Sequence, residues 1–138
     1  MSESQLERFL AAIDALDADA LTRLMAEDCT LLIADGRRAE GTEAVRALLG
    51  DLLAEMRSTS HRITSSWTIG DVEIAEVECD YTLQNWLELK AVPRAFFATV
   101  SDRAITGLRV YGAHERALAT EGAEPSGMRI GGRWMPPL

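Results

Sequence analysis

Apolar and polar residues alternate along this chain with two different periods, and the changes of period divide it into helices and strands. Apolar residues recur at helical spacing over residues 6–25 and, most clearly, over residues 45–56. Ser4 followed by Glu7 fits a capping box at the start of the first helix, and Asp17 or Asp19 can cap a second, shorter helix. The pattern therefore predicts two helices near the amino terminus and a long third helix that opens at Gly41.

Alternation with a period of two, which is typical of strands with two unlike faces, dominates the rest of the chain. Residues 29–34 are expected to form a strand, and Asp35-Gly36 predicts a tight turn into a short return strand. Four antiparallel strands are expected after residue 59, the third of them beginning at Pro93. Three helices gathered on one side of such a sheet predict an α+β fold whose interior tapers to a cone.

The alternation also predicts which side chains point inward. Cys79 and Tyr81 share the inner face of one strand, whereas Ile74 has the opposite parity, so a bulge is predicted near residues 75–76. In the preceding strand, unbroken alternation places Trp67 on the same face as His61.

Composition narrows the class of protein. The 138 residues suffice for one domain, which we place at residues 1–118, and the Gly- and Pro-rich stretch 119–138 is predicted to be a loop-like tail. Lys and Arg total 14 against 22 Asp and Glu, and the chain has no basic cluster, so we expect neither nucleic acid nor a membrane as partner. Acidic residues stand where a signal peptide needs a basic start, which indicates a cytoplasmic protein.

The two cysteines point to no special chemistry. Cys29 and Cys79 fall in apolar, strand-like segments without a CxxC spacing or a set of histidines. Buried, reduced thiols are therefore expected, with no metal site and no cofactor.

Two stretches resemble a known superfamily. The amino half, FLAAIDALDADALTRLMAEDCTLLIADGRRAEGTEAVRALL, resembles proteins related to nuclear transport factor 2. The carboxyl half, HRITSSWTIGDVEIAEVECDYT with VSDRAITGLRVYGAHERAL, resembles the SnoaL-like (polyketide cyclase-like) branch, so the likeness covers Leu6 to Leu118. It implies a cone-shaped, cystatin-like α+β barrel, with three N-terminal helices on a strongly curved antiparallel sheet, and a homodimer paired through the open sheet face. The reaction stays open, because this fold serves isomerases, cyclases, dehydratases, epoxide hydrolases and binding domains.

Most catalytic positions of that superfamily hold residues that cannot perform its chemistry. The tyrosine and the basic aspartate of the steroid isomerases fall on Phe9 and Ile33, and their protonated aspartate falls near Phe96 or Phe97. The aspartate of the polyketide cyclases falls on Ala113. Positions that do match the SnoaL-like pattern are mostly aromatic or structural: His61, Trp67, Tyr81, Pro93 and Tyr111.

Three residues are candidates for catalysis: Tyr81, His114 and Arg109. Tyr81 points inward, and its buried hydroxyl needs a partner in either the ligand or the core. His114 follows the missing cyclase acid by one residue and can replace it across a bulge, although we favour a surface residue at the end of the strand. Asp35 stands near the expected mouth of the cone. Aspartate is favoured in tight turns such as Asp35-Gly36, which explains the residue without a catalytic role.

Arg94 and Arg109 fall on adjacent strands within apolar sequence. Pointing into the cone, they can clamp a carboxylate or polarise a carbonyl. The alternative, which we favour, is ion pairing with Glu76, Glu78 or Asp80 on the other face of the sheet.

The remaining inward positions predict an apolar cavity, and therefore a small apolar or aromatic ligand. Its expected lining is Phe9, Leu24, Ile33, Leu49, Trp67, Tyr81, Phe96, Leu108 and Val110. The leading hypothesis is a homodimeric SnoaL-like protein that binds such a molecule, with its reaction undetermined. The alternatives are an isomerase, cyclase or dehydratase that acts next to a carbonyl through Tyr81 with His114 or Arg109, and a protein-interaction module whose cavity is filled by side chains.

Overall fold

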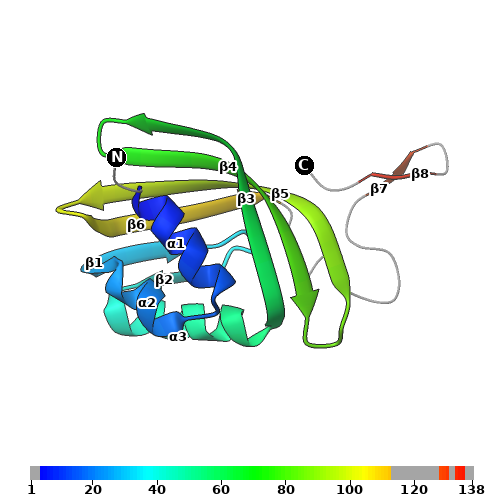
Figure 1. Ribbon diagram of the computed structural model, residues 1–138, viewed down its shortest axis with the longest axis horizontal. Coiled ribbons are helices and arrows are strands. Elements are labelled where there is room, and N and C mark those ends of the chain that lie inside the picture. The colour runs from blue at the N-terminus through cyan, green and yellow to red at the C-terminus, as the bar shows by residue number, and fades with distance from the viewer. Residues whose placement is uncertain (1–3, 113–127, 131–132, 136–138) are drawn as a thin grey trace.

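Three helices pack into the concave face of one curved, six-stranded sheet (Figure 1). The computed structural model describes residues 4–112, 128–130 and 133–135. The elements are α1 (Gln5–Asp14), α2 (Ala18–Arg23), β1 (Met25–Leu32), β2 (Arg38–Glu40), α3 (Thr42–Ala54), β3 (Met56–Ile69), β4 (Val72–Leu83), β5 (Glu88–Ser101), β6 (Ala104–Gly112), β7 (Met128–Ile130) and β8 (Arg133–Met135). The predicted α+β cone is confirmed.

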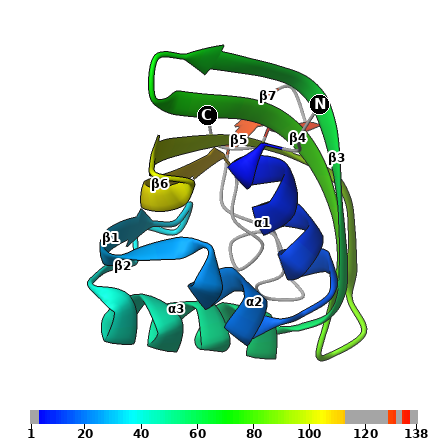
Figure 2. The ribbon, with the colours of Figure 1, turned by 60° about the vertical axis from the view of Figure 1, so that its left-hand side comes forward.

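The sheet bends around the first helix. Its strand order is β2-β1-β6-β5-β4-β3, and the long strands β3 and β4 curve past α1 while α2 and α3 close the narrow end (Figure 2). All neighbouring strands are antiparallel except β1 and β6, which run parallel with Leu31 opposite Leu108. The sequence pattern did not predict this parallel pair, because five elements, β2, α3, β3, β4 and β5, separate the two strands along the chain.

The first two helices begin as predicted. Ser4 Oγ accepts the backbone N–H of Glu7 at 3.1 Å, and the Glu7 carboxylate accepts the backbone N–H of Ser4 at 3.4 Å, which completes a capping box. Asp17 caps α2 by accepting the backbone N–H of Ala20 at 3.0 Å. The third helix ends at residue 54, so Met56, which was predicted to continue it, instead begins β3.

The core lies between the helices and the inner face of the sheet. Its most completely buried side chains are Phe9, Leu6, Leu21, Ile105, Leu108, Val45, Val77, Cys29 and Cys79. Both cysteines are free and buried, as predicted. Burial raises the pKa of the Cys29 thiol, which keeps it in its unreactive, protonated form.

The predicted position of the sheet bulge is wrong. The register shifts in β3, between Ile63 and Ser65, whereas β4 buries every odd residue from 75 to 83 without interruption. The extra residue in β3 moves Trp67 to the outer face of the sheet, the face turned away from the helices. There Trp67 lies opposite Ile74, and 49% of its surface is exposed.

Strand β5 is longer than predicted. It begins at Glu88, five residues before Pro93. The first residue of β5 that pairs with β6 is Arg94, opposite Gly112. Pro93 precedes it, where β5 has no strand paired on that side. Proline is tolerated at an edge because its missing N–H leaves no ladder hydrogen bond unmade.

The tail also differs from its prediction as a loop. Strands β7 and β8 pair as an antiparallel hairpin, with Arg129 opposite Trp134. His114 lies outside the described residues.

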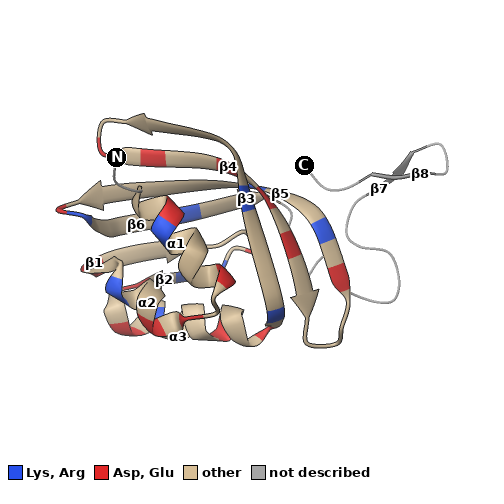
Figure 3. Cartoon of the chain, viewed as in Figure 1, with Lys and Arg blue, Asp and Glu red and all other residues tan. Residues whose placement is uncertain are grey.

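Charges are dispersed over the described part of the chain. Lys and Arg positions lie scattered among acidic ones on the helices and strands (Figure 3). Among the described helices, none is both long and apolar enough to cross a membrane. Residues 4–112, 128–130 and 133–135 contain no group of three or more His, Cys, Asp or Glu side chains placed to hold a metal ion.

Gly112 is expected to be required for the end of β6. Its φ is +133°, and an added Cβ would lie 2.6 Å from the carbonyl oxygen of Pro93. We expect Gly112→Ala to lower the free energy of unfolding by more than about 1 kcal/mol in urea denaturation. Gly50→Ala is the matched control: it lies within α3 with open space around the new Cβ, and should stabilise by about 0.5–1 kcal/mol. Equal stability of the two variants would contradict this account.

Candidate functional site

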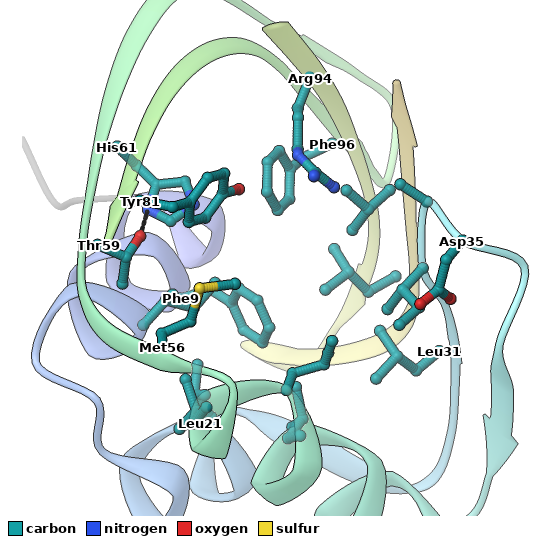
Figure 4. Close-up of a pocket in the computed structure, with 18 residues that line it drawn as sticks. Phe9, Leu21, Leu31, Asp35, Met56, Thr59, His61, Tyr81, Arg94 and Phe96 are labelled. Atoms are coloured by element: carbon teal, nitrogen blue, oxygen red, sulfur yellow. Dashed lines mark hydrogen bonds between the residues drawn. The ribbon is translucent and has the colours of Figure 1, made fainter. Parts of the chain in front are cut away.

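A cavity of about 80 Å³ lies inside the cone, between the helices and the inner face of the sheet (Figure 4). A single water needs roughly 10–15 Å³ measured in this way, so the cavity has room for several waters or a small organic molecule. Its lining is apolar apart from five side chains: Asp35, Thr59, His61, Tyr81 and Arg94.

Seven of the nine residues predicted to line the cavity do so. They are Phe9, Ile33, Leu49, Tyr81, Phe96, Leu108 and Val110. Leu24 is half-buried at the end of α2 and packs on the core away from the cavity, and Trp67 lies on the outer face. The inward parity of the last strand therefore places Leu108 and Val110 on the cavity wall, whereas the Trp67 position fails because of the bulge in β3.

His61 and Asp14 form a hydrogen-bonded pair in the cavity wall. Asp14, the last residue of α1, places Oδ1 2.6 Å from His61 Nδ1. Its other oxygen, Oδ2, accepts the backbone N–H of His61 at 3.0 Å. Both carboxylate oxygens thus act as acceptors toward one residue, which fixes the imidazole in position and directs the Nδ1 proton to Asp14.

The pair connects the cavity to the outside of the cone. The His61 side chain is 1% exposed and lines the cavity, whereas the Asp14 side chain lies behind it and is 30% exposed. Tyr81 and Phe96 hold the imidazole edge-on, with ring centroids 5.9 and 6.0 Å away, and Thr59 Oγ1 lies 3.3 Å from Nδ1. With Nδ1 directed to Asp14, Nε2 is the ring nitrogen that can exchange a proton with a ligand.

Arg94 is a cationic residue of the cavity wall, and it extends from β5 beside Phe96 (Figure 4). Only 8% of the residue is exposed, and its guanidinium carbon lies 5.5 Å from the centre of the Tyr81 ring. The favoured prediction of ion pairing across the other face is wrong for Arg94, because it lies on the inner face, opposite Val77. The outer-face acids Glu78 and Asp80 instead approach Arg62, at 3.9 and 2.9 Å.

Asp35 lies at the cavity wall in the turn between β1 and β2. Its carboxylate accepts the backbone N–H of Arg37 at 3.0 Å and the side-chain Nε at 2.8 Å, as its position in a turn predicts. Arg37 also contacts Glu55 at 3.3 Å, and the hydrogen bond with Asp35 is the main reason that the pKa of Arg37 is raised. The three residues join the β1–β2 turn to the end of α3.

Of the three predicted catalytic residues, the described part of the chain contains Tyr81 and Arg109, and it places them on opposite faces of the sheet. Tyr81 lines the cavity, with its hydroxyl directed into it (Figure 4). Arg109 is exposed on the outer face, where its guanidinium lies 5.3 Å from the Phe97 ring. His114 lies outside the described residues.

Sequence reasoning missed Asp14 and gave His61 no catalytic role. A usable indication was nevertheless present, because an acidic residue in the last turn of a helix is disfavoured by the helix dipole and needs a compensating partner. Asp14 stands there, with no basic residue in that turn. The inward position of Arg94 was predictable from strand alternation, since it is two residues from the inward-facing Phe96.

The fold and the site together define a SnoaL-like domain. The family model for that domain matches residues 6–133, and the chain belongs to this family. The match extends past residue 118, where we placed the end of the domain. A search of the curated proteins finds no match to the chain.

Solved structures share the fold at low identity. A protein with a ketosteroid isomerase-like fold from Catenulispora acidiphila DSM 44928, in complex with trimethylamine, has a TM-score of 0.77 at 22% identity, covering 88% of this chain and 95% of that one. An LEH-like epoxide hydrolase from M. tuberculosis has a TM-score of 0.68 at 19% identity, covering 79% of this chain and 80% of that one. A cystatin-fold protein from Novosphingobium aromaticivorans has a TM-score of 0.64 at 17% identity, with coverages of 79% and 98%.

Proposed function

We propose that this protein binds a small, mostly apolar organic molecule in the cone and moves a proton on it, with His61 as the general base. The single observation that carries the proposal is the Asp14–His61 pair in the cavity wall, with 2.6 Å between Oδ1 and Nδ1. Complexes such as that of the Catenulispora protein with trimethylamine support a small ligand. An open cavity weighs against an interaction module whose interior is filled by side chains.

The reaction best suited to this geometry is proton abstraction next to a carbonyl. His61 Nε2 takes the proton from carbon, and the electron pair of the broken C–H bond moves into the carbonyl to form an enolate. Asp14 stabilises the imidazolium that results, as an acid hydrogen-bonded to a catalytic histidine does. The proton then returns to another carbon in an isomerase, or a β-leaving group departs in a dehydratase.

Tyr81 is the expected donor to the enolate oxygen. Its hydroxyl points into the cavity, and its ring stands edge-on to His61. A donor placed in a cavity of low polarity stabilises developing negative charge more strongly than it would in water. Base and donor therefore come from neighbouring strands, with Thr59 opposite Tyr81 and His61 opposite Cys79.

Hydrogen–deuterium exchange at carbon tests the proposal without knowledge of the natural substrate. The purified chain is incubated in D₂O with phenylacetone, 2-tetralone or phenylpyruvate, and loss of the α-proton signals is followed by NMR. We expect saturable exchange above the buffer rate with at least one of them. Binding of these compounds without any accelerated exchange would leave a binding protein and refute the proton-transfer step.

The outer face of the sheet supports a homodimer as part of the same proposal. Trp67, Ile69 and Tyr111 are 49%, 66% and 46% exposed there, and Trp67 faces Ile74 across β3 and β4. Exposed apolar groups on one face of a sheet are typical of a surface that pairs with a second copy. The cytoplasm remains the expected compartment, in keeping with the two buried free thiols.

Trp67→Glu is expected to convert the dimer to a monomer in native mass spectrometry. The substitution puts a charge within the proposed contact, where it would be desolvated on pairing. Glu43→Gln, on the exposed side of α3, is the control and should leave the mass unchanged. A wild-type monomer at micromolar concentration, or a dimer that persists in Trp67→Glu, would refute this interface.

A further inference from the structure

Thr59 carries a buried hydroxyl in the cavity wall that the proton transfer proposed above does not use. The residue is 8% exposed and lines the cavity. It precedes His61 by two positions on β3, so both side chains lie on the inner face of the sheet. Figure 4 shows Thr59 beside the imidazole, with its hydroxyl oxygen turned toward that ring. Burying a hydroxyl is costly unless its proton finds an acceptor, so the direction of the Thr59 proton needs an explanation.

The Asp14–His61 pair restricts the direction of that proton. Thr59 Oγ1 lies 3.3 Å from His61 Nδ1, whereas Asp14 Oδ1 lies 2.6 Å from the same nitrogen. An ionised carboxylate only accepts, so Nδ1 carries its proton toward Asp14, both in the neutral imidazole and in the imidazolium. Nδ1 therefore has no lone pair to offer, and Thr59 Oγ1 can only accept from it. The hydroxyl proton of Thr59 must point elsewhere.

The remaining direction is into the cavity. Within residues 4–112, 128–130 and 133–135, the contact with Nδ1 is the one hydrogen bond of Thr59 Oγ1. Tyr81 lies directly opposite Thr59 on β4, and it also lines the cavity. The Cβ atoms of such cross-strand neighbours are about 4.5–5.5 Å apart, so the two side chains border the same part of the cavity wall. A ligand oxygen in that part of the cavity has hydroxyl groups from two neighbouring strands beside it.

We infer that Thr59 is a second catalytic donor, whose hydroxyl donates a hydrogen bond to the carbonyl oxygen of the ligand and, as the reaction proceeds, to the enolate oxygen. The inference rests on the function proposed above and adds one residue to it. The oxygen accepts from Thr59 and Tyr81, which both keep their protons, while the proton from carbon goes to His61 Nε2. Two donors that are fixed in advance stabilise the developing negative charge without reorganising during the reaction.

The stretching frequency of the ligand carbonyl tests this hydrogen bond directly. Phenylacetone and 2-tetralone, each labelled with ¹³C at the carbonyl, are bound to the full chain, and difference infrared spectra isolate the labelled C=O band. A hydrogen bond to the oxygen weakens the C=O bond. We therefore expect a lower frequency in the native protein than in Thr59→Val, which has the same shape without the hydroxyl. Equal frequencies in the two proteins, or no binding of either ketone to the native protein, would overturn the inference.

Proton exchange in D₂O measures the contribution of Thr59 to the reaction. Thr59→Val should lower the rate at saturating ligand by about 10²- to 10³-fold, the usual loss for one such donor. Thr59→Ser keeps the hydroxyl and should retain most of the native rate. Thr68→Val makes the same change at an exposed position of β3 and should exchange at the native rate. A native rate in folded Thr59→Val, or equal losses in Thr59→Val and Thr59→Ser, would refute the catalytic role.

The ¹⁵N chemical shifts of the His61 ring distinguish donation to the ligand from an effect on the base. We expect the same tautomer in the native protein and in Thr59→Val, because Asp14 holds the Nδ1 proton in both. A changed tautomer in Thr59→Val would make Thr59 a positioning residue of the imidazole and overturn its direct contact with the ligand. Thermal melts show whether each variant is folded. If Thr59→Val is not, Thr59→Ala, which removes the hydroxyl without adding a methyl group, takes its place.

The infrared test is separable from the proposed proton transfer. In a His61→Asn background, the frequency difference between Thr59 and Thr59→Val should persist, because donation to the oxygen needs no base. That difference without any proton exchange in the native protein would support the role of Thr59 and refute only the role of His61. Proton exchange on phenylacetone with equal frequencies would do the reverse.

Discussion

Replacing His61 with asparagine is expected to lower the rate of proton exchange by about 10²- to 10⁴-fold, which is the usual contribution of a general base. The asparagine amide nitrogen can occupy the place of Nδ1 and keep the hydrogen bond to Asp14, which in the native protein measures 2.6 Å. The substitution therefore removes the Nε2 base while leaving the link between α1 and β3. Exchange rates at saturating ligand, measured by NMR in D₂O, should fall while ligand affinity changes little.

The chain contains two histidines, which provides a matched control. His114→Asn should exchange protons at the native rate if His61 is the base. A large loss in His114→Asn, with His61→Asn unaffected, would instead support the catalytic role that the sequence suggested for His114. Loss of ligand binding in His61→Asn would show that the residue shapes the cavity and would count against a purely chemical role.

Local patterns predicted most of the fold because each helix and turn is specified by residues a few positions apart. Ser4 with Glu7 and Asp17 with Ala20 are contacts of this kind, and the structure contains both. Long-range pairings were less accessible. The bulge in β3 depends on how that strand fits β4 around the curve of the sheet, so alternation alone put Trp67 on the wrong face.

The site was harder to predict because its parts are distant in sequence. Asp14 and His61 are 47 residues apart, and neither has a neighbour in sequence that suggests catalysis. Their contact follows from the packing of α1 into the concave face of β3, which no periodicity reports. Arg94 was considered and assigned to the wrong face, although the inward position of Phe96 two residues later fixed its direction.

Replacing Asp14 with asparagine is expected to be nearly as damaging to exchange as removing the base, although it changes a group that lies behind the cavity wall. Asp14 offers two acceptors to His61, one to the backbone N–H at 3.0 Å and one to Nδ1 at 2.6 Å. Asparagine has only one oxygen. The backbone N–H of His61 can only donate, so the single oxygen of the asparagine should accept from it. The amide NH₂ then faces Nδ1.

An NH₂ group facing Nδ1 forces that nitrogen to accept, which moves the ring proton to Nε2 and blocks the base. In the serine protease triad, the same aspartate-to-asparagine change produces the wrong histidine tautomer and lowers kcat about 10⁴-fold. We expect a loss of about 10²- to 10⁴-fold in exchange rate with ligand affinity nearly unchanged, and ¹⁵N chemical shifts of the His61 ring should report the change of tautomer.

Asp17→Asn is the matched control, since asparagine caps a helix as well as aspartate does, and it should leave both the exchange rate and the stability unaltered. Native exchange rates in Asp14→Asn, with the His61 tautomer reversed, would show that Nε2 is not the base and would move the search for it to Tyr81.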